Sequence, residues 1–189
     1  MTMPVGYIKE IPLTVELISG GGATDANARY EIEPKSVILA GDKALLDAYN
    51  TITLDPIDLS QVVSTATFER KIPISSELTN LSNVTAATVT VTVSGLATRT
   101  ISVGADRIEF INGPEGYNVT AVNQSVSVLL RGVQESLDLV MENNIRIVAN
   151  LENVSASAGT YKVSAAVYVD GFDDVGAVGE YKLIVSVKR

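Results

Sequence analysis

Three residue types that carry much of protein chemistry are missing from this chain of 189 residues. It contains no cysteine, no histidine and no tryptophan. Without cysteine there is no thiol nucleophile, no disulfide and no thiolate metal site. Without histidine the chain lacks the commonest general base and the commonest transition-metal ligand. Its aromatic residues are 7 Tyr and 3 Phe, so the composition does not suggest an aromatic-lined groove for sugars or peptides.

Positive charge is also scarce, with 14 Lys and Arg against 22 Asp and Glu and a net charge of −8. Nucleic acids bind basic patches, so we do not expect a nucleic-acid partner. No apolar run approaches the roughly 20 residues that span a bilayer. The opening residues Met1 to Gly6 lack the basic and apolar regions of a signal peptide. We therefore expect any membrane anchor or targeting segment to be absent from this chain.

The dominant pattern in the chain is the alternation of apolar and polar residues with period two, which predicts β-strands. Valine and threonine, which favour the pleated surface of a sheet, are common in the alternating segments. The predicted strands include Ile8–Leu17, Ala87–Val93, Asn144–Leu151, Tyr161–Val169 and Tyr181–Lys188. The sequence therefore predicts a fold that is mainly β.

Two short segments have helical spacing instead. The first runs from Asp42 to Tyr49, with Asp42 as its expected N-cap. The second runs from Val133 to Met141 and repeats apolar residues at i, i+4 and i+7, which should share one face. These residues are Val133, Leu137 and Val140.

The two helices belong to an internal repeat. Each follows a short apolar strand that ends in glycine, and the two glycines, Gly41 and Gly132, lie 91 residues apart. Leu46 and Leu137 occupy equivalent helix positions at the same separation. We therefore predict two tandem copies, residues 4–96 and 97–189, each mainly β with one short helix. Almost no linker separates them, which predicts a semi-rigid, end-to-end arrangement.

Two loops could be mistaken for ligand sites. Gly20–Thr24 is glycine-rich, but no lysine and no long helix follow it, so a flexible hairpin loop is favoured over a phosphate cradle. Asp170–Asp174 holds three carboxylates, but their spacing differs from that of an EF-hand and is typical of a turn between strands.

The sequence also lacks recognisable catalytic motifs. Asp55 and Asp58 could form a glycosidase pair, but solvated turn carboxylates are the favoured interpretation in a unit of this size. The chain contains no Ser-x-x-Lys and no Gly-x-Ser-x-Gly motif. We therefore predict no catalytic, cofactor-binding or metal-binding residue.

The order of the motifs resembles the YbbR-like domain family. The first copy shows this order in Lys9–Val15, Tyr30–Pro34, Val37–Gly41 and Ile57–Ser60. The second copy is more divergent. It keeps Tyr117–Val119, Val128–Gly132 and the helix, whereas Arg99–Val103 replaces the proline-containing opening strand and Ala149–Glu152 replaces the Ile-Asp-Leu-Ser segment. The resemblance covers nearly the whole chain and depends on the order of the motifs, which occurs twice.

This resemblance implies extracytoplasmic repeats, usually tethered to the cell membrane by one N-terminal transmembrane helix. Such CdaR-type proteins of Gram-positive bacteria partner the membrane diadenylate cyclase and regulate cyclic di-AMP synthesis. The family has no catalytic motif. We therefore expect a non-enzymatic regulatory module without a cofactor, in contact with diadenylate cyclase outside the cytoplasm. The alternative is a structural spacer, or a cell-surface adhesin or cell-wall-binding stalk.

Overall fold

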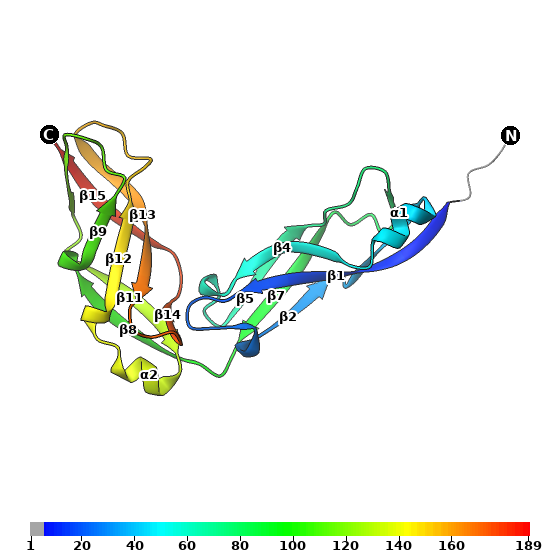
Figure 1. Cartoon of the computed structure of the whole chain (residues 1–189), viewed down its shortest axis with the longest axis horizontal. Coiled ribbons are helices and arrows are strands. Elements are labelled where there is room, and N and C mark those ends of the chain that lie inside the picture. Colours follow the sequence, from blue (N-terminus) through cyan, green and yellow to red (C-terminus); the bar gives the residue numbers. More distant parts are fainter. Residues whose placement is uncertain (1–5) are drawn as a thin grey trace.

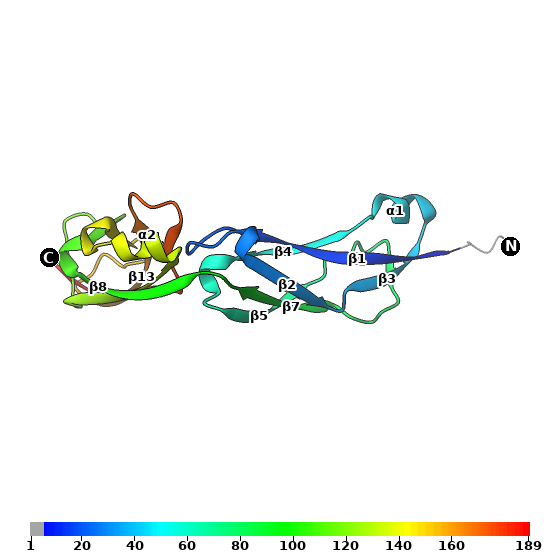
Figure 2. The same ribbon diagram turned by 90° about the horizontal axis from the view of Figure 1, so that it is seen from below.

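The computed structural model describes residues 6–189. Pro4 and Val5, at the start of the predicted first copy, lie outside the described residues. The chain forms two β-rich units joined end to end (Figure 1), and its two termini lie at opposite ends of an elongated molecule (Figure 2). The predicted fold class, mainly β with one short helix per repeat, is confirmed.

The first unit has two sheets, in the strand orders β4-β1-β3-β6 and β2-β7-β5. They enclose an apolar core that includes Val37, Leu39, Leu54 and Val89. The elements of this unit are β1 (Tyr7–Ile18), η1 (Asp25–Asn27), β2 (Ala28–Glu33), β3 (Ser36–Gly41), α1 (Lys43–Ala48), β4 (Ile52–Asp58), η2 (Leu59–Gln61), β5 (Thr65–Lys71), β6 (Thr79–Asn80) and β7 (Ala86–Val93).

The second unit also has two sheets, in the orders β10-β15-β13-β12-β9 and β14-β11-β8. Its core includes Val128, Leu130, Ile147 and Val185. The elements are β8 (Ala97–Gly104), η3 (Ala105–Arg107), β9 (Ile108–Ile111), β10 (Asn118–Ala121), β11 (Ser125–Gly132), α2 (Gln134–Leu139), η4 (Glu142–Asn144), β12 (Ile145–Asn150), β13 (Gly159–Val169), β14 (Val175–Ala177) and β15 (Tyr181–Lys188).

The strand pairing of the two units is largely equivalent, although the β12–β13 pairing has no counterpart between β4 and β5. In the first unit, β1 pairs antiparallel with β3 through its first half and parallel with β4 through its second half. In the second unit these two roles are divided, because η3 interrupts the strand. There, β8 pairs antiparallel with β11, and β9 pairs parallel with β12. The internal repeat inferred from the sequence is thus present in the strand order, while the exact limits 4–96 and 97–189 stay predictions.

The two helices differ in how well the sequence located them. Asp42 caps α1 as expected, since its side chain accepts a hydrogen bond from Ala44 N at 2.8 Å. The second helix is shorter than expected. Val133 has extended backbone angles and is 44% exposed, so the prediction that it shares the buried face was wrong. Leu137 and Val140 are buried.

A basic residue in the first strand of each unit caps the C-terminal end of the short helix. Lys9 Nζ donates to Leu46 O at 3.0 Å and to Tyr49 O at 2.7 Å. Arg99 Nη1 donates to the equivalent carbonyls of Leu137 and Val140, at 3.0 and 3.2 Å. The last carbonyls of a helix have no partner within the helix, and a cation is a favourable donor there. The basic residue that opens each repeat is therefore a helix C-terminal partner.

Leu46→Ala and Leu137→Ala test the equivalence of the two helices. Both leucines are almost fully buried, at 2% and 1% exposure, so each truncation should lower the free energy of unfolding by about 2–5 kcal/mol. Leu139 lies on the same helix as Leu137 but is 66% exposed, and Leu139→Ala should cost less than about 0.5 kcal/mol. Urea denaturation followed by circular dichroism measures all three. Equal costs for Leu137 and Leu139 would contradict this packing.

Candidate functional site at the junction of the two units

The two units meet around the side chain of Arg131, at the end of β11. It is 1% exposed and is the one buried charged residue within residues 6–189. Its guanidinium group belongs to the second unit but enters the first, where it donates only to backbone carbonyls. Arg131 Nε bonds to Gly21 O (2.8 Å), Nη2 to Leu59 O (2.9 Å) and Gly20 O (3.2 Å), and Nη1 to Val63 O (3.0 Å) and Val62 O.

This arrangement satisfies a buried cation without a carboxylate. A guanidinium group has five N–H donors in a fixed fork, and five carbonyl oxygens surround this one. Burial lowers the pKa of Arg131 from its ordinary value, although an arginine side chain stays protonated in proteins. The acceptors come from two segments of the first unit, Gly20–Gly21 and Leu59–Val63. Only one relative orientation of the units therefore satisfies the charge.

Two glycines let the backbones of the units touch at this point. Gly22 has a φ of +72°, and a Cβ atom there would lie 2.1 Å from Arg131 O. A Cβ atom on Gly176, in β14, would lie 2.7 Å from Gly22 N. The expectation that Gly20–Thr24 is a flexible hairpin loop was therefore wrong in one respect. The loop does turn back on itself through a Gly20–Ala23 bridge, but it is packed against the second unit.

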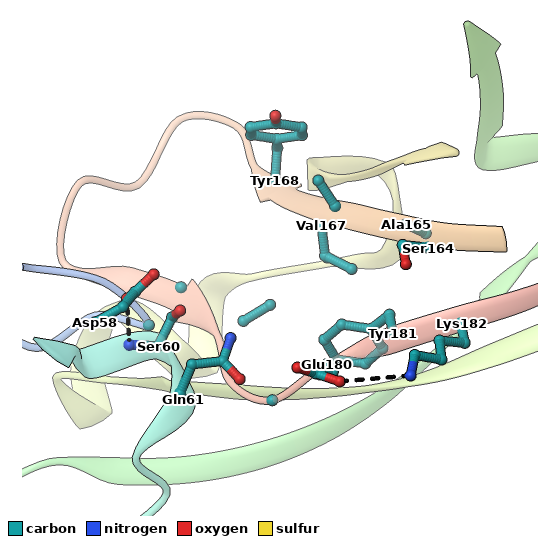
Figure 3. Close-up of a pocket in the computed structure, with 15 residues that line it drawn as sticks. Asp58, Ser60, Gln61, Ser164, Ala165, Val167, Tyr168, Glu180, Tyr181 and Lys182 are labelled. Atoms are coloured by element: carbon teal, nitrogen blue, oxygen red, sulfur yellow. Dashed lines mark hydrogen bonds and ion pairs between the residues drawn. The ribbon is translucent and has the colours of Figure 1, made fainter. Parts of the chain in front are cut away.

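Beside this contact lies a cleft of about 660 Å³ that both units line (Figure 3). Asp58, Ser60 and Gln61 contribute from the first unit, and Ser164–Tyr168 and Gly179–Lys182 from the second. A hydrogen bond from Gly179 N to Ser60 O, 2.8 Å long, joins the two units at its edge. Glu180 and Lys182 form an exposed ion pair at 3.7 Å. The cleft is therefore mixed in charge.

The acidic residues that lie close together in the sequence have different surroundings in the structure. Asp58 lines the cleft and caps η2 by accepting a hydrogen bond from Ser60 N at 2.8 Å, whereas Asp55 is exposed and does not line the cleft. In the Asp170–Asp174 turn, Asp170 pairs with Arg146 at 3.4 Å, and Asp174 accepts from Ser136 Oγ at 2.6 Å. In the described part of the chain, no group of three or more acidic residues is placed to hold a metal ion.

Sequence reasoning missed Arg131 as a functional residue, although a signal for it was present. In the first copy, the strand before the helix is apolar. Its residue Ala40 lies 91 positions before Arg131 and so occupies the equivalent place. A single arginine in the second copy of a buried strand indicates a charge with a specific acceptor. The sequence could not show that the acceptors are backbone carbonyls of the other copy.

Arg131→Met should loosen the junction, because it removes the guanidinium group and leaves its carbonyl acceptors without a donor. The chain has no cysteine, so Glu31→Cys and Lys162→Cys place one spin label on an exposed site of each unit. Double electron–electron resonance should give one narrow distance distribution for the parent and a broad one for Arg131→Met. The control is Arg146→Met, which removes an exposed arginine whose contacts with Glu109, Asp170 and the ring of Tyr168 all lie within the second unit. A distribution that stays narrow in Arg131→Met would contradict the role given to this residue.

Calcium should not raise the melting temperature of the protein. The carboxylates of Asp170 and Asp174 have separate protein partners, and a ligand stabilises a fold only if it binds the folded state. Differential scanning calorimetry with and without millimolar calcium checks this. A concentration-dependent rise that Asp173→Asn abolishes would show that the turn is a cation site.

Within the described residues, no helix is both long and apolar enough to cross a membrane. No protein-family model matches the chain, and no curated protein matches it. Solved structures do. A YbbR-like protein from Streptococcus pneumoniae is 14% identical, covers 100% of this chain and 97% of its own, and has a TM-score of 0.36.

Two shorter structures each cover 49% of this chain. The YbbR-like domain of the lmo2119 protein from Listeria monocytogenes is 20% identical over 93% of its own length, with a TM-score of 0.34. SuR18C from Streptococcus thermophilus is 21% identical over 90% of its own length, with a TM-score of 0.38. All three scores lie below 0.5, and the fold is defined by this chain's own strand order. Two of these three structural neighbours are named as YbbR-like, the family that the sequence resembles.

Proposed function

We propose that the chain is a non-catalytic, extracytoplasmic interaction and regulatory module. In this proposal it is part of a membrane-tethered, CdaR-type regulator of diadenylate cyclase. The observation that carries the proposal is the use of the one buried charge in residues 6–189 to fix the orientation of two units. A protein that presents a surface to a partner at a set distance and angle needs such a joint.

The chemistry of the cleft supports binding over catalysis. Its carboxylates have local partners, since Asp58 caps η2 and Glu180 pairs with Lys182. General acid–base catalysis needs a group with a suitable pKa within reach of a substrate atom, and histidine, the usual choice, is missing from the chain. The proposed regulatory partner is taken from the sequence resemblance alone.

A structural spacer or surface stalk is the second candidate. The end-to-end arrangement, with the termini at opposite ends of the molecule (Figure 2), favours it. A spacer needs length and stiffness, whereas a regulator also needs a surface that a partner recognises. The two functions therefore differ in whether the chain changes the activity of a partner.

Co-expression with the membrane diadenylate cyclase of the source organism tests the proposal. The chain is fused behind a transmembrane helix so that it faces outward, and cellular cyclic di-AMP is measured by mass spectrometry. The fusion should change cyclic di-AMP relative to the transmembrane helix alone. Arg131→Met should reduce that change, because it disturbs the orientation of the units, and Arg146→Met should preserve it. An unchanged cyclic di-AMP level, with the fusion present at the cell surface, would favour the spacer.

A further inference from the structure

One strand of the second unit loses a neighbour halfway along its length. On one side β13 pairs with β15, from Gly159↔Val187 to Ala165↔Tyr181, and there the pairing ends. On the other side it pairs with β12, from Ala149↔Ala165 to Ile145↔Val169. The stretch of β13 after Ala165 is therefore paired on one side, and its other edge lines the cleft between the units.

The register shows which backbone groups face the cleft. In an antiparallel pair, the N–H and C=O groups of successive residues point alternately to the two neighbouring strands. Asp170 N donates to Asn144 O at 2.7 Å, in register with the pair Tyr168↔Arg146. The N–H and C=O groups of Tyr168 and Ala166 therefore point toward β12. Those of Val167 point the other way, into the cleft.

The segment that could have paired with Val167 is held elsewhere. Continuing the β15 register would place Gly179 opposite Val167, but Gly179 N donates to Ser60 O of the first unit. Val178 N donates to Leu129 O at 2.9 Å, and the hydroxyl group of Tyr181 donates to Val178 O at 2.7 Å. Burial raises the pKa of Tyr181, which keeps this hydroxyl a neutral donor. The open edge is therefore built into the fold and maintained in part by the junction.

We propose that this cleft binds an extended peptide segment of a protein partner, which adds as a strand to β13 by pairing with the backbone of Val167. Strand addition uses main-chain hydrogen bonds for affinity and side-chain contacts for specificity. This inference rests on the proposed function as an interaction module and names the class of partner for it.

Charge indicates which segment suits the cleft. Asp58 lies across the cleft from Val167 (Figure 3), and it is exposed although it caps η2. Lys182 is already paired with Glu180, and the whole chain carries a net charge of −8. The segment therefore carries a lysine or arginine next to the residue that pairs with Val167, so that its cation reaches Asp58.

An NMR titration tests the site with a defined probe, the peptide Thr-Val-Lys-Val-Thr with acetylated and amidated ends. Binding with a Kd of about 1 mM or tighter should shift the amide signal of Val167 and slow its hydrogen exchange. The same peptide with N-methylated valines should not bind, because it lacks the N–H groups that pair with a strand. Equal binding of the methylated peptide, or shifts confined to residues outside the cleft, would overturn the proposal. So would the absence of any shift at several times that concentration.

Two protein variants complete the test. Val167→Pro removes an N–H group that the fold does not use, and it should abolish the shifts that the peptide causes in the neighbouring amide signals of the cleft. Its matched control is Thr67→Pro on the exposed edge of β5. There Val93 N donates to Ser64 O, so the backbone groups of Ser64 point toward β7. Because the direction alternates along the strand, the N–H group of Thr67 points away from β7 and is also unused. Asp58→Asn should weaken the lysine peptide but not a glutamine version of it. If the glutamine version loses as much affinity, Asp58 does not recognise the cation and the proposed specificity is wrong.

The outcome separates this inference from the proposed function. A chain that changes cyclic di-AMP but does not bind the peptide would leave the regulatory proposal standing and remove the strand-addition site. A chain that binds the peptide at Val167 but leaves cyclic di-AMP unchanged would keep the site and remove the cyclase as its partner.

Discussion

The shape of the molecule depends on how one buried cation is satisfied. Arg131 crosses from the second unit into the first, and five backbone carbonyls of the first unit accept its hydrogen bonds. Carbonyl oxygens are fixed by the fold of their unit, so they cannot follow the arginine as a flexible carboxylate side chain would. A shift of one unit against the other would leave a desolvated charge and several acceptors unpaired, which is costly inside a protein. The junction therefore has one favoured geometry.

The cleft is a consequence of the same geometry. The loop after β14 leaves the β13–β15 sheet and donates from Gly179 to Ser60 of the first unit, so the sheet opens beside the junction. The glycine-rich turn of the first unit packs against Arg131 and Gly176 just next to it. Orientation of the units and exposure of the β13 edge are thus linked. A change that loosened the joint would also alter the surface available to a partner.

The two copies share the residues that make the fold and differ in the residue that makes the joint. Lys9 in the first unit and Arg99 in the second have the same role, since each donates hydrogen bonds to the carbonyl groups at the end of a short helix. The position of Arg131 is occupied in the first copy by Ala40, which cannot donate a hydrogen bond from its side chain. The two copies therefore share the residues that form the local structure. They differ at the strand-end position of Ala40 and Arg131, where the second copy contacts the neighbouring unit.

By itself the sequence determined the features that depend on neighbouring residues. Period-two alternation located the strands, Asp42 marked the start of a helix, and the spacing of Leu46 and Leu137 revealed the repeat, because each of these signals lies within a few residues of its effect. The joint and the cleft were decided by tertiary structure. Arg131 and Gly21 lie 110 positions apart, and no local pattern shows that a glycine-rich turn will accept a guanidinium group from another unit. The open edge at Val167 arises because Gly179 bonds to Ser60, a choice made by packing between units rather than by the strand's own sequence.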